Sequence, residues 1–349
     1  MRAIIYSFLM FCSFGLFSCE TIVDEVDLSN FPDLQEKVVV TAFIGPQDDI
    51  IRVRLNKSTP LYGTISGKYE KIFDPISQDS VLYYQPSQYI TDATVTISNS
   101  TKTASLAYTS DSKSYTIAAK DFQILPGQTL DLSVIWNGKN ITASTIVPLN
   151  TVTIDNLSIE PFTEIRRNFF ESDTALGYKI NFTYQDVPGK ENYYKLWGEL
   201  EHRVKLPVFD KDNNAIYVDR TAYSYLFWPD AETTGSDRYQ SDKGIDGKVI
   251  KSVNGEITQR RISVCPAGTD SFQGKGCLSA KNIPNSPKTI KLQIWNTSKD
   301  LYDYSLSLRK FNATANNPFS EPTPVYSNVK NGLGIFAGYN GFEGVVKVK

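Results

Sequence analysis

Short stretches in which hydrophobic and polar residues alternate constrain the fold of this chain more than any other feature. Residues 130–136 alternate up to Asn137-Gly138, and residues 141–147 alternate directly after it. A period of two is typical of a β-strand that buries one face. Asn and Gly both tolerate a positive φ, so Asn-Gly between two such stretches predicts a tight hairpin. We therefore expect a mainly β fold, in keeping with the 20 Tyr and 19 Phe of the chain.

The N-terminal half has the pattern of one β-sandwich. Further strands ahead of the hairpin are predicted at 37–44, 51–55 and 93–97. Short strands with turn signals about every ten residues predict an immunoglobulin-like β-sandwich over residues 37–148, closed by Pro148. The segment 63–90 is longer than a usual connection, which predicts either a functional loop or a partly ordered insertion.

A second β-rich domain that carries one packed helix is expected over residues 149–349. Its strands are predicted at 152–154, 178–184, 193–201, 216–218, 260–264, 289–295 and 345–348. Residues 230–256 are rich in Gly, Asp, Ser and Thr without a clear period, which predicts a long surface excursion. Near residues 299–312 the apolar residues recur with helical spacing, and Thr297 with Asp300 fits a capping box.

The first residues have the pattern of an exported lipoprotein precursor. Arg2 precedes an apolar run over residues 3–17, which is too short to span a bilayer comfortably. Leu16-Phe17-Ser18-Cys19 follows the bacterial lipobox pattern, in which the Cys thiol takes a diacylglyceryl group and becomes the new N-terminus. We therefore expect a signal peptide at residues 1–18 and lipidation at Cys19, rather than an apolar N-terminal strand or an uncleaved anchor.

The residues that follow Cys19 predict a lipidated acidic tether over residues 19–36. Its first part contains Glu20, Asp24, Glu25 and Asp27. An acidic stretch at this place resembles the export signal that sends lipoproteins of Bacteroidota to the outer face of the outer membrane. A solvated linker is the alternative interpretation. The expected location is the outer membrane, with a lipid anchor and exposure at the cell surface.

Charge and hydropathy limit the classes of partner. Lysine and arginine number 36 against 38 acidic residues, and no basic block is present to follow a phosphate backbone. We therefore expect no nucleic-acid partner. No segment after residue 18 reaches the roughly 18 apolar residues of a membrane-spanning helix, so we expect the N-terminal lipid to make the membrane contact.

Two cysteines remain after Cys12 is removed with the signal peptide and Cys19 is lipidated. Cys265 and Cys277 are an even pair in an exported chain and are predicted to form a disulfide around a Gly-rich loop. A metal site is the rival interpretation. It needs more ligands than two thiols, and the only histidine, His202, is far away in the sequence. We expect neither a metal nor a cofactor.

Three further motifs resemble catalytic or binding motifs only superficially. Residues 210–214 have oxygen side chains at alternate positions, as in a calcium loop, but Ala215 replaces the turn glycine, so a hairpin turn is favoured. Residues 332–338 miss the dinucleotide-binding pattern by one residue and are interpreted as strand glycines. His202 has no accompanying nucleophile motif and is predicted to be a surface or half-buried residue. No catalytic residue is predicted, and we do not expect an enzyme.

An aromatic stretch precedes Pro229. Tyr223, Tyr225 and Trp228 are candidate ligand-binding residues, because aromatic side chains beside a loop can stack on sugars or anchor a protein partner. The alternative is that they are core residues or cross-strand pairs of a β-sheet.

The C-terminal stretches 317–322, 325–328 and 331–339 resemble the ending of the DUF4249 family, a Bacteroidota outer-membrane lipoprotein family of unknown function. More loosely, the resemblance covers most of the mature chain. It implies a lipoprotein commonly encoded beside a TonB-dependent receptor, which is then the expected partner. It implies no catalytic residues and no ligand. The leading hypothesis is a binding or accessory subunit of such a transporter. The alternatives are an adhesion or envelope-assembly lipoprotein and, less favoured, a glycan or peptide hydrolase.

Overall fold

The structure is a computed structural model. It describes residues 36–58, 67–74, 79–86, 88–167, 172–210, 214–228, 237–259, 262–264, 277–283, 285–314 and 323–348. The described strands and the helix all belong to one unit, residues 37–59 and 65–349. The signal peptide, Cys19 and almost all of the predicted tether lie outside the described residues.

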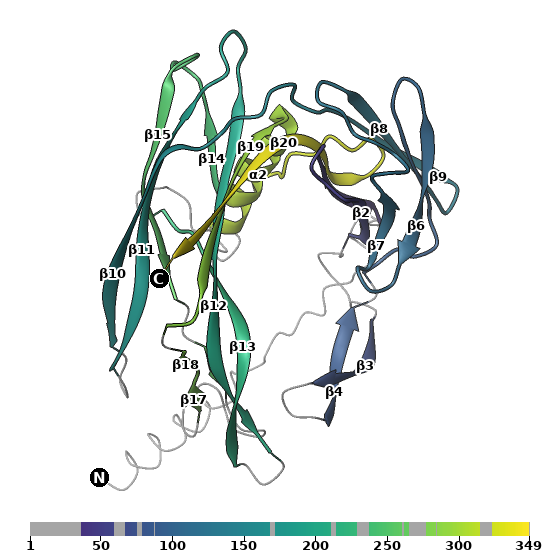
Figure 1. The fold of residues 1–349 in the computed structure, drawn as a ribbon. Coiled ribbons are helices and arrows are strands. Elements are labelled where there is room, and N and C mark those ends of the chain that lie inside the picture. The colour runs from purple at the N-terminus through teal and green to yellow at the C-terminus, as the bar shows by residue number, and fades with distance from the viewer. Residues whose placement is uncertain are drawn as a thin grey trace, which may run out of the picture. The chain divides into compact units, whose positions relative to one another are not determined.

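Strands dominate the described residues, which also contain one helix, and the prediction of a mainly β fold with a packed helix is confirmed (Figure 1). The elements are β1 (Val38–Ile44), β2 (Ile50–Lys57), β3 (Gly67–Asp74), β4 (Asp79–Pro86), β5 (Thr94–Ser98), β6 (Thr103–Thr109), β7 (Ser114–Ala118), β8 (Thr129–Trp136), β9 (Lys139–Ile146), β10 (Asp155–Arg167), β11 (Ser172–Gln185), β12 (Tyr193–Phe209), β13 (Ala215–Tyr225), β14 (Arg238–Ser241), β15 (Val249–Thr258), β16 (Ser263–Val264), β17 (Leu278–Ser279), β18 (Lys281–Asn282), β19 (Lys288–Thr297), α2 (Lys299–Thr314) and β20 (Leu333–Val348).

One large mixed sheet runs through the unit in the order β13-β12-β19-β20-β1-β2-β7-β6-β5-β8-β9, and β14 and β18 also pair with β12. A second sheet has the order β10-β11-β15, and β3-β4 and β16-β17 are separate pairs. The predicted hairpin at Asn137-Gly138 joins β8 to β9, with φ of 47° and 72° at its two residues.

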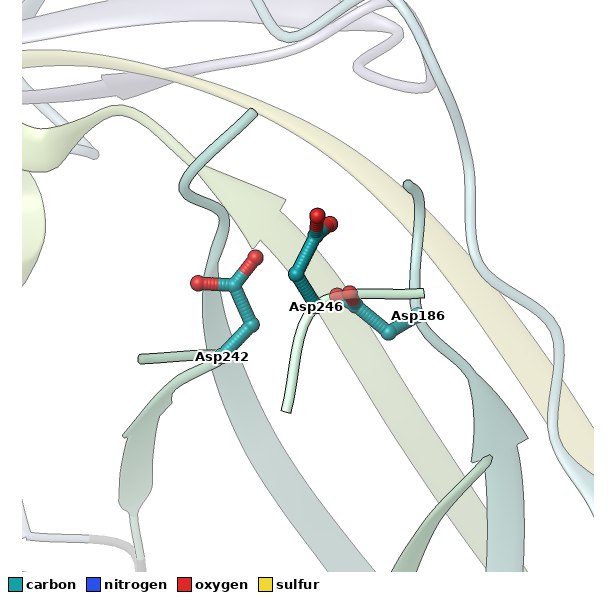
Figure 2. Close-up of side chains that lie close together, drawn as sticks. All are labelled: Asp186, Asp242 and Asp246. Atoms are coloured by element: carbon teal, nitrogen blue, oxygen red, sulfur yellow. The ribbon is translucent and has the colours of Figure 1, made fainter. Parts of the chain in front are cut away.

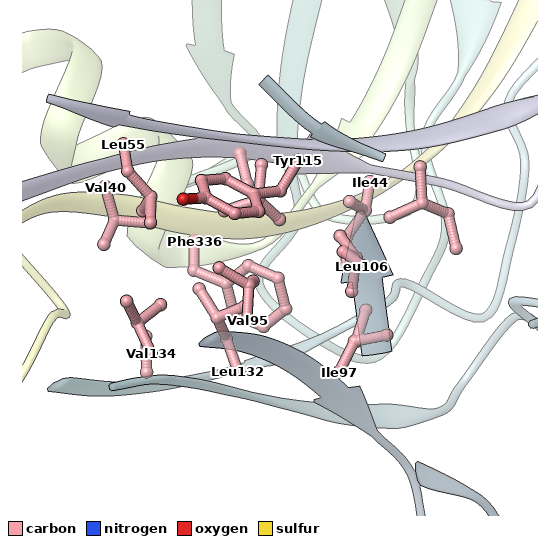
Figure 3. Close-up of a cluster of buried hydrophobic side chains, with 14 of the residues drawn as sticks. Val40, Ile44, Leu55, Val95, Ile97, Leu106, Tyr115, Leu132, Val134 and Phe336 are labelled. Atoms are coloured by element: carbon pink, nitrogen blue, oxygen red, sulfur yellow. The ribbon is translucent and has the colours of Figure 1, made fainter. Parts of the chain in front are cut away.

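The N-terminal strands enclose the first hydrophobic core. Strand β6 pairs with β5 through its first residues and with β7 through its last, so the sheet turns a corner there and folds over itself. Side chains of β1, β2 and β7 then face those of β5 and β8, with Phe336 of β20 buried among them (Figure 3). This core forms because alternate residues of each strand are apolar and point to the same face.

The residues before and within β20 cover the outer edge of β9. Thr142 and Lys330 exchange two backbone hydrogen bonds of 3.2 and 2.7 Å. Asn331 Nδ2 donates to Asn140 O at 3.0 Å, and Gly338 N donates to Thr145 Oγ1 at 2.8 Å. The C-terminal stretch on which the family resemblance rests therefore has a structural role at this edge.

A second core lies between the other half of the large sheet and the sheet β10-β11-β15. Buried residues of β12 and β19, such as Leu196, Leu200 and Leu292, pack against Ile180 of β11 and Ile257 of β15. Helix α2 packs on the opposite face through Leu301, which contacts Ile335 and Ala337 of β20. Strand β20 therefore contributes Phe336 to the first core and Ile335 and Ala337 to the contact with α2.

The prediction that residues 230–256 are an irregular excursion is wrong, because β14 and most of β15 lie within them. The period of two in β15 is interrupted by a bulge. Ile180 pairs with Gly255 but Phe182 pairs with Ser252, so one extra residue lies on β15, and Asn254 has a φ of 60°. In a regular strand an even-numbered and an odd-numbered residue face opposite sides, but Ile250 and Ile257 are both buried because the extra residue lies between them. The bulge therefore hides the alternating pattern in the sequence.

The segment 63–90 contains the antiparallel pair β3-β4. At the start of α2 the predicted capping box is wrong. Ser298 O accepts hydrogen bonds from Leu301 N and Tyr302 N, so Ser298 holds the N-cap position. Thr297 is the last residue of β19, and its hydroxyl donates to Tyr193 O at 3.2 Å. Among the described residues, no helix has both the length and the hydropathy needed to cross a bilayer.

Candidate functional site

An open cavity of about 850 Å³ is the leading candidate site within the part of the chain that the structure describes. Three segments that are distant in the sequence line it: residues 144–150, residues 187–193 and residues 296–300, together with Gly127 and Thr129. Its volume falls within the range of roughly 300–1,000 Å³ that is typical of pockets for small molecules.

The first wall is the end of β9 and the linker that follows it. Asn340 makes four hydrogen bonds, three of them to this linker and one to Gln47. Its Nδ2 donates to Pro148 O at 3.1 Å and to Leu149 O at 3.2 Å. Its Oδ1 accepts from Gln47 Nε2 at 2.9 Å and from Thr151 Oγ1 at 2.7 Å. A buried side-chain amide with all of these partners defines the geometry of the wall.

The second wall, residues 187–193, is held by three carboxylates that do not themselves line the cavity. Asp186, Asp242 and Asp246 converge there, each with an oxygen within 4.8 Å of the others (Figure 2). Asp242 Oδ2 accepts from Asn192 N at 2.9 Å, and Asp246 Oδ1 accepts from Gly189 N at 2.9 Å. The wall is thereby attached at two of its backbone amides.

Asp186 completes this cluster from the buried end of β11. Its Oδ2 accepts from Gly247 N at 2.7 Å and its Oδ1 accepts from the Tyr194 hydroxyl. Burial and the neighbouring carboxylate raise the pKa of Tyr194, so its phenol remains a donor at physiological pH. Three carboxylates at this separation are also a donor set that suits a hard cation. Since these hydrogen bonds already offset the negative charges, we assign the cluster to anchoring the wall.

The third wall is the junction of β19 and α2. Asn296 Nδ2 donates to Asn150 O at 3.1 Å and so ties this wall to the linker. Lys299 forms a 2.5 Å ion pair with Asp303, and that hydrogen bond raises the pKa of Lys299. Burial raises the pKa of Tyr193 above its ordinary value, and its hydrogen bond to Glu191 raises it further. The rim of the cavity therefore carries positive and negative side chains, and Glu191 is already hydrogen-bonded to Tyr193.

None of the aromatic residues proposed from the sequence lines the cavity. Tyr223 and Tyr225 are 43% and 50% exposed on the outer face of β13, and the ring of Tyr225 lies 6.2 Å from that of Trp197. Trp228 is 1% exposed and belongs to the second core, where it packs with Leu226. Only Tyr223 and Tyr225 are therefore available to a ligand or partner at the surface.

The prediction that His202 is a surface or half-buried residue is wrong, since its side chain is 1% exposed. It lies on the core-facing side of β12, between the buried residues Leu200 and Val204. Burial lowers the pKa of His202 below 6.5; a hydrogen bond with the backbone of Leu200 opposes this shift, and the charge of Lys288 adds to it.

This burial predicts a loss of stability in mild acid. Below the unfolded pKa of about 6.5 the unfolded chain binds a proton at His202 and the folded chain does not, so stability falls as the pH falls. Urea unfolding at pH 7.5 and pH 5.5 should show a larger decrease for the native chain than for His202→Gln. Equal decreases would show that His202 does not contribute.

The disulfide between Cys265 and Cys277 stays a prediction, because Cys265 lies outside the described residues. The strands beside it provide a reason to expect it. Val264 of β16, the residue before Cys265, pairs with Leu278 of β17, the residue after Cys277, in antiparallel register.

We expect mass spectrometry without reductant to find no free thiol at either position. In the chain-entropy model the loop closure contributes about 3 kcal/mol, so the double Ser variant should unfold at lower urea. Alkylation of both cysteines in the native protein would contradict the pairing.

The remaining motifs have structural roles. Asp210 Oδ1 accepts from Asn214 N at 2.8 Å at the end of the β12-β13 hairpin, as the hairpin interpretation predicted, although residues 211–213 lie outside the described coordinates. Gly334 and Gly338 lie in β20 against other backbone segments, at Val40 O and Ile146 O. This close approach confirms the interpretation as strand glycines.

Fold and cavity together define a mainly β protein in which one shared sheet joins two hydrophobic cores. The chain belongs to the family described as Domain of unknown function (DUF4249), whose model matches residues 24–343. No curated protein and no solved structure matches the chain. The sequence resemblance is thereby confirmed at the level of the family.

Proposed function

We propose that this protein is a lipid-anchored lipoprotein of the bacterial outer membrane that serves as a binding or accessory subunit of a TonB-dependent transporter. The supporting observation from the structure is the open cavity at the junction of the two cores. The lipobox at Leu16-Phe17-Ser18-Cys19 and the acidic residues after it support the location.

The lining of the cavity suits capture of a ligand. Ile146 and Leu149 are 60% and 69% exposed at its rim, and they leave apolar surface for a ligand to cover. Lys190 and Glu191 lie at the same rim and add charged groups of both signs. Apolar contact with a few polar groups is the usual composition of a ligand site.

Affinity purification of the full chain from detergent-solubilised outer membranes tests the partner. We expect a TonB-dependent β-barrel transporter to co-purify, and recovery of the protein alone would contradict the proposal.

A substitution in the cavity tests ligand capture. Ile146→Arg should slow growth on the same nutrient on which deletion of the whole gene slows growth. The matched control is Ile135→Arg, because Ile135 is similarly exposed on β8 and does not line the cavity.

Anchoring by lipid gives a separate prediction. One acyl chain binds a bilayer reversibly with a constant of about 10⁴ M⁻¹, and each buried CH₂ adds about 0.8 kcal/mol, so the two or three chains of a processed Cys19 should hold the protein stably. We expect it to resist high salt and to be released by detergent, and Cys19→Ala to enter the soluble fraction. A Cys19→Ala variant that is exported and still sediments with membranes would contradict lipid anchoring.

An adhesion or envelope-assembly role is the second candidate. The observation that favours it is the exposed aromatic row on β13, since exposed Tyr side chains are common anchors of protein interfaces. Deletion of the gene separates the two roles. The first predicts slower growth on one nutrient, and the second predicts weaker surface attachment or a leaky envelope with unchanged growth.

A further inference from the structure

The dipeptide Asn-Gly occurs four times in the chain, at residues 137–138, 254–255, 331–332 and 340–341. Asn-Gly is prone to spontaneous loss of ammonia, because glycine has no side chain to hinder its amide nitrogen as that nitrogen attacks the asparagine side chain. The reaction needs a free N–H on the glycine, an asparagine side chain that can turn toward it, and room for the backbone to rotate. The structure distinguishes the four pairs by these requirements.

Asn340-Gly341 does not meet them. The Asn340 side chain is buried and makes four hydrogen bonds. Gly341 N donates to Gln47 Oε1 at 3.1 Å. Both the side-chain amide that would be attacked and the nitrogen that would attack it are therefore held by other partners.

Asn331-Gly332 is held by the strands beside it. Asn331 Nδ2 donates to Asn140 O at 3.0 Å. A Cβ at Gly332 would lie 2.8 Å from Val38 O, so another backbone segment already fills the space beside this glycine. The asparagine side chain is therefore engaged, and the backbone has no room to rotate.

Asn254-Gly255 lies at the bulge of β15. Gly255 is buried and pairs with Ile180 of β11, and a Cβ at Gly255 would lie 3.0 Å from Ile180 O. Asn254 N donates to Asn181 Oδ1 at 2.9 Å. Turning the amide of Gly255 toward the Asn254 side chain would therefore separate β15 from β11.

Asn137-Gly138 meets all three requirements. Both residues are exposed, and they form the turn between β8 and β9. In the part of the chain that the structure describes, the Asn137 side chain and Gly138 N have no hydrogen-bond partner. A Cβ at Gly138 would meet nothing within 4 Å, so the turn can rotate without a clash. The same dipeptide is therefore reactive here and protected at the other three places.

We propose that Asn137 is a site of spontaneous deamidation, and that it is the one Asn-Gly pair of the four that reacts while the protein stays folded. Gly138 N attacks Cγ of Asn137, its proton passes through water to the side-chain amide, and ammonia leaves. The cyclic imide then takes up one water, which opens either of its C–N bonds and gives aspartate or isoaspartate. Water is the only co-reactant, and the site is independent of the proposed transport role.

The isoaspartate product changes the hairpin locally. In isoaspartate the chain runs through the side-chain carbon, so the backbone of the turn is longer by one methylene group. A tight turn holds Trp136 opposite Lys139, and the longer turn should loosen this pairing. The cavity lies at the other end of the hairpin, where Thr129 pairs with Ile146. Deamidation should therefore accumulate with the age of the molecule without altering the candidate ligand site.

Peptide mass spectrometry after incubation at mildly alkaline pH tests the proposal. In urea all four Asn-Gly pairs should convert at similar rates, because the unfolded chain holds none of them. In the folded chain residue 137 should convert about tenfold or more faster than residues 254, 331 and 340, since each of those must first open its local contacts. Conversion of any of the three as fast as residue 137 in the folded chain would overturn the proposal. So would an unchanged Asn137 when the urea sample converts.

A variant distinguishes this turn from other sites of ageing. Asn137→Gln retains a side-chain amide, but its attack by Gly138 N would have to close a larger ring, which is slower. We expect the folded native chain to release ammonia and to form isoaspartate, and the folded Asn137→Gln variant to do almost neither. Equal release of ammonia by the two folded proteins would show that another residue is modified and would overturn the proposal.

Discussion

Replacing Gly334 with alanine is expected to unfold the chain or to destabilise it by more than about 4 kcal/mol, the level reached by the most severe single substitutions. Gly334 has a φ of 102°, a backbone conformation that residues with a Cβ rarely adopt. A Cβ at this position would lie 2.0 Å from Val40 O, in the strand that pairs with β20. The clash is with backbone, so relief requires β1 and β20 to separate.

Gly138→Ala provides the matched control, because Gly138 also has a positive φ, of 72°, but no atom lies within 4 Å of a Cβ built there. This substitution should lower the free energy of unfolding only by the cost of the backbone conformation, about 1–2 kcal/mol. Urea unfolding followed by tryptophan fluorescence measures both variants. If the two substitutions cost the same, the close approach of β1 to Gly334 is not important for stability.

Replacing Asn340 with alanine is the second large effect that we expect, at about 3 kcal/mol. The substitution leaves Pro148 O and Leu149 O without their buried donor and removes the acceptor of Thr151 Oγ1 and Gln47 Nε2. A buried polar group that loses its partner costs about 1–3 kcal/mol, and some of these groups can turn to water.

Gln293→Ala is a suitable comparison for Asn340→Ala. Gln293 Nε2 donates to Glu343 at 2.7 Å, but this hydrogen bond is exposed to solvent, so its loss should cost less than about 1 kcal/mol. Asn340→Ala should also weaken ligand capture, since Asn340 holds the linker that lines the cavity. A variant as stable as the native chain would show that water replaces all four hydrogen bonds.

Alternation was sufficient to predict strands where each strand keeps one phase along its whole length. The β8-β9 hairpin is the best case, because both strands bury alternate residues and Asn137-Gly138 has the dihedral angles of a tight turn. β15 was missed because its bulge shifts the phase after Ser252. A bulge is a response to pairing with another strand, so its position is not a property of the local sequence.

The cavity was not predictable from local patterns. Its three walls come from segments near residues 147, 190 and 298, and only the paired strands bring them together. Asn340 has no recognisable motif, although it makes four hydrogen bonds to groups nearly 200 or more residues away. The predicted capping box is absent for a related reason, because the hydroxyl of Thr297 donates to Tyr193 O of the neighbouring strand.

The pairing of β20 limits the order in which the parts of the protein can fold. Val39 at the beginning of β1 pairs with Leu333 near the end of the chain, and the same strand continues into pairing with β19. Contacts between such distant residues form slowly, because a long loop must close first. Strand β1 therefore keeps one edge unpaired until β20 reaches it. A chain that lacks β20 would leave this edge of β1 open and would lose Phe336 from the first core and Phe342 from the second, so we expect it to be degraded more readily than the native chain.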